Sequence, residues 1–332
     1  MEESRNITRH PLTLLSLTYL ALLLFAALLL FFFGERHFLL ICIRFTPPIV
    51  WLLPSMLFFS IALWKRRRVD ILISIITASF VLFHFFDLQL GPPPRKATPD
   101  LRVVNWNVHH SSKGVKKLVD EIVALDANLL LLQEACEVPK YDWPDPVPAI
   151  KKRLPKWHFI KSRSLLTASK YPIKNRRLEK LGIHRPALIG ELQVEDKTIT
   201  VINVHLYVST PGKPQLRKEW WRPIPFLNDL INVRQEASDL LFKVLSKTKG
   251  PLIIGGDFNT TPNSLICTTL DRQLTNAFKA AGTGFGLTYS TKLPLWRIDH
   301  LFVSKGITPT RCRVGKEKSS DHRPLITELI LR

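Results

Sequence analysis

The stretch GPLIIGGDFN, residues 250–259, decides the fold. Three branched apolar residues at 252–254 follow Gly250 and Pro251 and lead into two glycines, which predicts a short, buried strand. Asp257 and Asn259 come where that strand ends. The stretch therefore predicts a strand whose end carries a carboxylate and a carboxamide out of a buried core.

Five further short apolar runs with polar or turn residues at their ends predict strands of the same kind. They are LRVVNWNV (101–108), ANLLLLQEA (127–135), TITVINVHL (198–206), WRIDHLFVS (296–304) and PLITELIL (324–331). Between some of them, residues 114–125 and 233–245 place apolar residues at helical spacing. The fold class is therefore α/β. There is no GxGxxG or GxxxxGK[ST] loop, which argues against the common nucleotide-cofactor enzymes.

Composition narrows the class of protein further. The chain has 332 residues, of which 46% are hydrophobic and 22% charged, so it is not intrinsically disordered. Its four cysteines lack the spacing of a zinc site and are too few for a disulfide scaffold. The formal net charge is +20, and residues 91–332 alone carry +17. Such a domain attracts polyanions or anionic lipid headgroups.

Residues 1–90 predict a membrane region with about three transmembrane helices. Pro11 to Phe33 is a 23-residue stretch without a charged residue, long enough to cross a hydrocarbon core of ~30 Å. A second apolar stretch runs from Thr46 to Trp64, and a third from Val69 to Leu90. Asp70, His84 and Asp87 lie near the ends of the third stretch and are expected at the interfaces.

The distribution of basic residues predicts the orientation in the membrane. Arg5 and Arg9 precede the first span, and the run KRRR (65–68) separates the second from the third, so both are expected on the cytoplasmic side. Residues 34–44 form an external loop in this interpretation. Three spans place the rest of the chain outside the cytoplasm, the arrangement we favour, whereas two spans leave it in the cytoplasm.

A Pro-rich linker, residues 91–100, is expected to join this region to a domain of residues 101–332. Within that domain, polar side chains stand at the ends of six predicted strands. As a set they offer carboxylates, carboxamides and imidazoles without thiols, which suits a hard divalent cation and phosphate chemistry. They are Asn105, Asn107, Gln133, Glu134, Asn203, His205, Asp257, Asn259, Asp299, His300, Asp321 and His322.

Six ordered signatures make the domain resemble the endonuclease/exonuclease/phosphatase superfamily, which includes DNase I-like nucleases, sphingomyelinases and inositol phosphatases. The signatures are VVNWNV (103–108), LLQEA (131–135), NVHL (203–206), GGDFNTTP (255–262), RIDHLFVS (297–304) and SSDHRP (319–324). The resemblance implies a four-layer α/β sandwich (DNase I-like) with the site at one end of its two sheets.

The resemblance also implies a role for each matching residue. Glu134, with Asn107 and the additional carboxylate of Asp321, would hold Mg²⁺, with Mn²⁺ as a second choice. Asp257 would orient or deprotonate the attacking water, and Asn259 would donate to the phosphate. His322, paired with Asp299, would donate to the phosphoryl oxygens.

The histidines divide into two groups. His205, in NVHL, resembles the histidine that assists the leaving oxygen in the DNase I, sphingomyelinase and phosphatase branches, and this context disfavours an abasic-site endonuclease. His300 stands where many relatives have an aromatic residue and is expected to be structural. His109, His110 and His184 receive no role and are expected in solvated loops.

The layout resembles a bacterial group of membrane-anchored proteins linked to glycopeptide resistance, which implies a multi-pass protein of the bacterial cell membrane. We expect a metal-dependent phosphoric-ester hydrolase whose substrate is a phospholipid or lipid phosphate. Two alternatives remain open, a DNase I-like nuclease and a catalytically silent module that binds anionic lipid. Tryptophans and basic residues in 207–228 suit a lipid interface, a packed loop or base stacking alike. The bilayer and a phosphate ester are the only partners expected.

Overall fold

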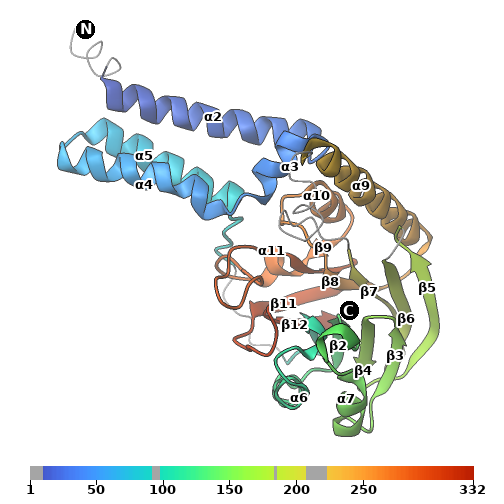
Figure 1. Ribbon diagram of the computed structural model, residues 1–332. Coiled ribbons are helices and arrows are strands. Elements are labelled where there is room, and N and C mark those ends of the chain that lie inside the picture. Colours follow the sequence, from blue (N-terminus) through green and yellow to red (C-terminus); the bar gives the residue numbers. More distant parts are fainter. Residues whose placement is uncertain (1–9, 92–97, 183–184, 207–222) are drawn as a thin grey trace. The chain divides into compact units, whose positions relative to one another are not determined.

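The computed structural model describes residues 10–91, 98–182, 185–206 and 223–332, which form two compact units (Figure 1). One unit contains the chain up to Leu88 together with residues 263–265. The other contains residues 89–262 and 266–332. The basic residues Arg5 and Arg9, most of the linker, His184 and the Trp-rich part of 207–228 lie outside the described residues.

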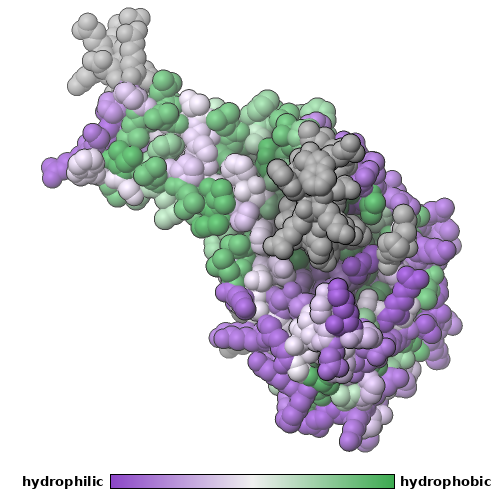
Figure 2. Space-filling view, viewed as in Figure 1, coloured by the Kyte–Doolittle hydropathy of each residue, from purple (hydrophilic) through white to green (hydrophobic). Residues whose placement is uncertain are grey.

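The N-terminal unit is helical. Its elements are α2 (Pro11–Phe33), α3 (Phe38–Phe45), α4 (Pro48–Trp64), α5 (Arg68–Phe80) and the π-helical turn η1 (Val81–Phe85). Two helices, Pro11–Phe33 and Arg68–Phe85, are long and apolar enough to cross a membrane, and the pair α3 and α4 is bent by 72° at its break. If that pair is one span, there are three. Many large apolar side chains are exposed on these helices, with more polar ones between them (Figure 2).

One segment of this unit differs from the expected loop. Residues 34–44 contain most of helix α3. His37 caps the start of this helix, because its side chain accepts a hydrogen bond from the backbone N–H of Leu39.

Asp70, expected near an interface, is fully buried in the first turn of α5. It pairs with Arg67 and accepts a 2.6 Å hydrogen bond from the Thr13 hydroxyl. A buried carboxylate is tolerable only with such partners.

The second unit contains two six-stranded sheets among its described residues, as the DNase I-like expectation required. The first sheet has the order β11-β12-β1-β2-β4-β3 and the second the order β5-β6-β7-β8-β10-β9. The strands are β1 (Leu101–Asn107), β2 (Leu129–Gln133), β3 (His158–Ser162), β4 (Leu165–Ser169), β5 (Ile173–Lys180), β6 (Pro186–Val194), β7 (Lys197–His205), β8 (Leu252–Asp257), β9 (Thr275–Asn276), β10 (Asp299–Val303), β11 (Ile307–Val314) and β12 (Leu325–Leu331).

Helices cover the outer faces of both sheets. They are α6 (Val115–Ala124), α7 (Val147–Arg153), α9 (Pro223–Lys247) and α10 (Leu265–Asp271). The short helix α11 (Ala277–Ala281) packs instead into the core between the sheets, and the 3-10 turns are η2 (His109–Ser111) and η3 (Pro139–Tyr141). Alternate residues of β2 explain the layers: Leu129 and Leu131 pack between the sheets, while Leu130 and Leu132 pack against α6 and α7. The second sheet packs its other face against α9 and α10. The domain is therefore a four-layer α/β sandwich.

Several elements carry no clear pattern in the sequence. Strand β5 reads IKNRRLEK and is exposed along most of its length because it lies at the edge of its sheet. Helix α9 begins at Pro223, ten residues before residues 233–245, whose helical spacing of apolar residues predicts a helix. All six strands predicted from apolar runs are present.

Strand register brings the predicted polar residues to one edge. Strands β1 and β2 run parallel and pair Asn107 with Gln133, while β7 and β8 run parallel and pair His205 with Asp257. Strand β10 runs antiparallel to β8 and pairs Asp299 with Asp257. The carboxyl ends of four strands and the start of a fifth therefore meet at one place.

Buried His300 makes the stability of this unit depend on pH. Its Nε2 lies 2.8 Å from the Thr260 carbonyl oxygen, and its ring packs among Phe258 and Phe302. Burial lowers the pKa of His300 to about 3, helped by the charge of Arg297. Because the folded pKa lies below the unfolded value near 6.5, neutral His300 favours folding above pH ~6.5, and this contribution is lost as pH falls.

We therefore predict that, below pH ~6, the free energy of unfolding of the wild-type protein falls by about 1.4 kcal/mol per pH unit relative to that of His300→Phe. The phenylalanine variant cannot be protonated at this position. The measurement is thermal or urea unfolding of both full-length proteins in detergent at several pH values. Parallel stability curves for the two proteins would show that His300 is not the buried neutral group described above.

Candidate active site

Asp257 is the centre of the polar cluster. It is 1% exposed at the end of β8, where Gly256 allows the chain to pass within contact of the Val204 carbonyl. Its Oδ2 accepts a 3.0 Å hydrogen bond from the amide nitrogen of Asn107, and its Oδ1 accepts one of 2.9 Å from the backbone N–H of Asn259. Both oxygens are thereby held in one orientation.

His205 lies between Asp257 and Glu134. Its Nε2 is 3.6 Å from an Asp257 oxygen and 3.8 Å from a Glu134 oxygen, and the ring is 2% exposed. On the other side, Nη1 of Arg185 lies 2.7 Å from its Nδ1. A guanidinium has only donors, so Nδ1 accepts and the ring proton resides on Nε2, facing the two carboxylates. Arg185 therefore fixes the tautomer of His205.

His322 lies on another side of Asp257. Its Nδ1 is 2.8 Å from Asp299 Oδ2, and its Nε2 is 3.7 Å from Asp257 Oδ2. The Trp106 indole donates to the His322 carbonyl, and the Ser320 hydroxyl receives the His322 backbone N–H. The loop after β11 is thus tied to β1, which sets the position of the imidazole.

Burial and mutual charge shift the proton affinities of this group. Burial raises the pKa of Asp257 to about 7, against the lowering effect of His322. Burial alone would lower the pKa of His322, but Asp299 and Asp257 together raise it to about 10. The arrangement therefore holds a charged imidazolium beside a carboxylate of unusually high basicity.

Asn259 is oriented from two sides. It has a left-handed φ of 50°, and its amide nitrogen donates to the Leu206 carbonyl. Arg234 of α9 donates to the Asn259 carbonyl at 3.1 Å.

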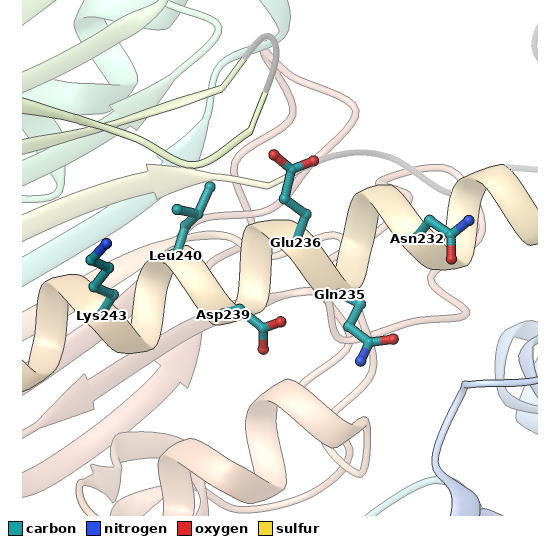
Figure 3. Close-up of a pocket in the computed structure, with 6 residues that line it drawn as sticks. All are labelled: Asn232, Gln235, Glu236, Asp239, Leu240 and Lys243. Atoms are coloured by element: carbon teal, nitrogen blue, oxygen red, sulfur yellow. The ribbon is translucent and has the colours of Figure 1, made fainter.

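Further along α9 lies a shallow hollow with side chains of mixed charge (Figure 3). It is lined by Asn232, Gln235, Glu236, Asp239, Leu240 and Lys243. Those residues belong to the surface of the helix and not to the polar cluster around Asp257.

Asp321 lies at the open side of the cluster. Its side chain is 32% exposed and lies 3.7 Å from Nδ1 of His109, whose backbone N–H donates to Oδ1 of Asn107. His110 Nε2 lies 3.2 Å from Glu134 Oε2. Both histidines were expected in solvated loops, and the structure places both beside predicted site residues instead.

A continuous chain of contacts therefore connects all eight residues that the sequence indicates, namely Asn107, Glu134, His205, Asp257, Asn259, Asp299, Asp321 and His322. Other polar residues from the strand ends lie below them. Gln133 donates to Asn105 and Asn203 at 3.0 and 2.8 Å, in a buried amide network between the sheets. These three amides are buried core groups, in which the Gln133 Oε1 has no hydrogen-bond partner among the described residues. Arg185 and His110 are site residues that the sequence did not single out.

Two sets of side chains here suit a divalent cation. Asp257, Asp299 and His322 offer ligand atoms within 4.8 Å of one another, a spacing that can hold a metal ion. In that set the 2.8 Å contact between His322 Nδ1 and Asp299 Oδ2 competes with an ion for these two ligand atoms. Glu134, Asp321 and Asn107, the residues that the sequence analysis expects to bind metal, offer oxygen atoms, the usual ligands of Mg²⁺ and Mn²⁺, and His109 contacts both Asp321 and Asn107.

A family model described as the endonuclease/exonuclease/phosphatase family matches residues 104–322, about two thirds of the chain. The chain belongs to this family. Endonucleases, exonucleases and phosphatases all hydrolyse phosphoric esters, so membership confirms the expected class of enzyme.

Relatives and solved structures agree with this family. A UPF0294 protein of Yersinia enterocolitica is 27% identical over 268 residues, which cover 72% of this chain and 89% of the relative. An endonuclease/exonuclease/phosphatase from Bacteroides vulgatus superimposes with a TM-score of 0.54 at 15% identity, covering 70% and 99% of the two chains. A mannosyl-6-phosphatase of Bacteroides thetaiotaomicron superimposes with a TM-score of 0.54 at 17% identity, and the match covers 70% of this chain and 100% of the phosphatase. These structures show the shared fold.

Proposed function

We propose that this family member is a membrane-anchored, divalent-metal-dependent hydrolase of a phospholipid or lipid phosphate. The observation that carries the hydrolase is the buried Asp257, held by Asn107 and Asn259 and faced by His205 and His322. The observation that favours a lipid is the presence, in the same chain, of two or three stretches long and apolar enough to cross a membrane.

Each residue has a chemical task in this proposal. With its pKa raised to about 7, Asp257 accepts a proton from the attacking water at neutral pH. The His322 imidazolium, held by Asp299, donates to the phosphoryl oxygens on which negative charge develops. The side-chain amide of Asn259 has two N–H donors. Among the described residues one of them donates to the Leu206 carbonyl, which leaves the other for the phosphate.

Glu134, Asn107 and Asp321 would hold the cation. When bound there, a divalent ion supplies Lewis-acid activation and a clamp for the substrate phosphate. We predict that Glu134→Gln lowers the affinity for the ion about tenfold or more and that excess metal restores part of the activity. Titration calorimetry measures the affinity, with exposed Glu137→Gln as the matched control. Equal affinity in Glu134→Gln and wild type would remove Glu134 from the metal site.

The substrate test uses the full-length protein in nanodiscs, with plasmid DNA, phospholipid vesicles and a polyprenyl pyrophosphate offered in parallel. Asp257→Ala is the blank. Preferential hydrolysis of a lipid phosphate supports the proposal, and preferential cutting of DNA makes the chain a tethered nuclease. Metal binding without turnover of any substrate would indicate a silent lipid-binding module.

A further inference from the structure

Three consecutive residues after β1 adopt an uncommon backbone conformation. His109, His110 and Ser111 have φ values of 45°, 52° and 55°, in the left-handed region that disfavours residues other than glycine. Each such residue costs on the order of 1–2 kcal/mol. The turn is held by a hydrogen bond from the His110 N–H to the Glu134 carbonyl and by one from the Ser111 hydroxyl to the Pro144 carbonyl. The strained turn directs the His110 side chain at Glu134.

The neighbours of His110 allow two positions for its ring hydrogen. Its Nδ1 lies 3.2 Å from the Cys136 carbonyl oxygen, which can only accept, and 3.3 Å from the Cys136 Sγ, whose thiol can donate. The ring also stacks on Trp143 with an interplanar angle of 24°, which limits its rotation. When Nδ1 donates to the carbonyl oxygen, the lone pair of neutral His110 is on Nε2, the atom that lies 3.2 Å from Glu134 Oε2.

Two neighbouring ligand atoms of one six-coordinate ion, each about 2.1 Å from it, lie about 3 Å apart, close to the 3.2 Å between His110 Nε2 and Glu134 Oε2. We infer that His110 Nε2 and Glu134 Oε2 are ligands of one divalent cation, the ion of the function proposed above. A backbone carbonyl that accepts from one ring nitrogen is the usual support for a histidine whose other nitrogen binds a metal. The rival arrangement is a hydrogen bond from His110 Nε2 to Glu134 that takes the place of a cation. It forms either when Nδ1 accepts from the Cys136 thiol or when an additional proton makes His110 an imidazolium.

A nitrogen ligand changes which ion the site selects. Imidazole suits transition ions such as Fe²⁺, Ni²⁺ and Zn²⁺, with Mn²⁺ the weakest of the first-row series, whereas Mg²⁺ takes oxygen ligands almost alone. The site therefore favours a transition ion such as Mn²⁺ over the Mg²⁺ that the family resemblance implies.

The test loads metal-free full-length protein in detergent with Mn²⁺, without substrate, and records pulsed electron paramagnetic resonance. We expect a hyperfine coupling from a histidine nitrogen in wild type, its loss in His110→Gln, and its retention in His158→Gln, which changes an exposed histidine of β3. Calorimetry should show that His110→Gln weakens Mn²⁺ about tenfold or more and Mg²⁺ far less.

Two results would overturn the inference. One is a wild-type spectrum without nitrogen coupling, or a coupling that persists in His110→Gln. The other is tighter metal binding by His110→Gln, as the imidazolium arrangement requires. Neither readout needs turnover, so bound Mn²⁺ with nitrogen coupling and no hydrolysis would leave the His110 inference standing while the proposed function fails.

Discussion

Replacement of Asp257 by alanine should lower kcat by about a thousandfold or more while the protein stays folded. The carboxylate is the acceptor for Asn107 and for the Asn259 backbone, and it faces the reactive nitrogens of His205 and His322. Its loss removes the proton acceptor and also the group that orients its neighbours. Initial rates with saturating metal and the preferred substrate measure the effect.

Asp257→Asn separates these two contributions. It preserves the volume and one acceptor oxygen of the side chain. Its NH₂ group, however, faces one of the two donors to Asp257, the Asn107 amide or the Asn259 backbone N–H, and a carboxamide cannot take a proton from water. We expect it to be nearly as inactive as Asp257→Ala. The matched control is Asp271→Asn, since Asp271 lies on α10 and pairs with Lys279 at 2.7 Å. Wild-type turnover by either Asp257 variant would exclude the role assigned to this residue.

The sequence predicts which polar residues meet at the strand ends for a physical reason. Buried strands need branched apolar residues, and a polar side chain is tolerated only where a strand leaves the core, so Asp257 and His205 are visible as interruptions of apolar runs. Parallel pairing of β7 with β8 then brings them together. Edge strand β5 has no such pattern, because its exposed face imposes no choice of residue.

Arg185 and His110 show where this reasoning ends. Arg185 stands just before β6, in a stretch whose composition resembles a surface loop, and only the fold brings it to His205. The two histidines after β1 resemble a polar turn in sequence. Their backbone conformation, which points His110 at Glu134, depends on contacts from Pro144 and Cys136 and has no local signature.

His322→Ala should lower kcat about 10²- to 10³-fold, because it removes a charged donor aimed at the developing phosphoryl charge.

The carboxylates of Asp299 and Asp257 raise the pKa of His322 to about 10 despite burial. The imidazolium therefore persists throughout the neutral range and is lost only as pH rises through that value. Asp299→Asn removes the nearer carboxylate, 2.8 Å from Nδ1, so the alkaline fall in activity should move to lower pH. Rates of both variants between about pH 6 and pH 10, beside exposed His158→Ala, measure this shift. An unchanged alkaline limb in Asp299→Asn would mean that Asp299 positions the ring without holding its charge, and full activity in His322→Ala would exclude the imidazolium from the reaction.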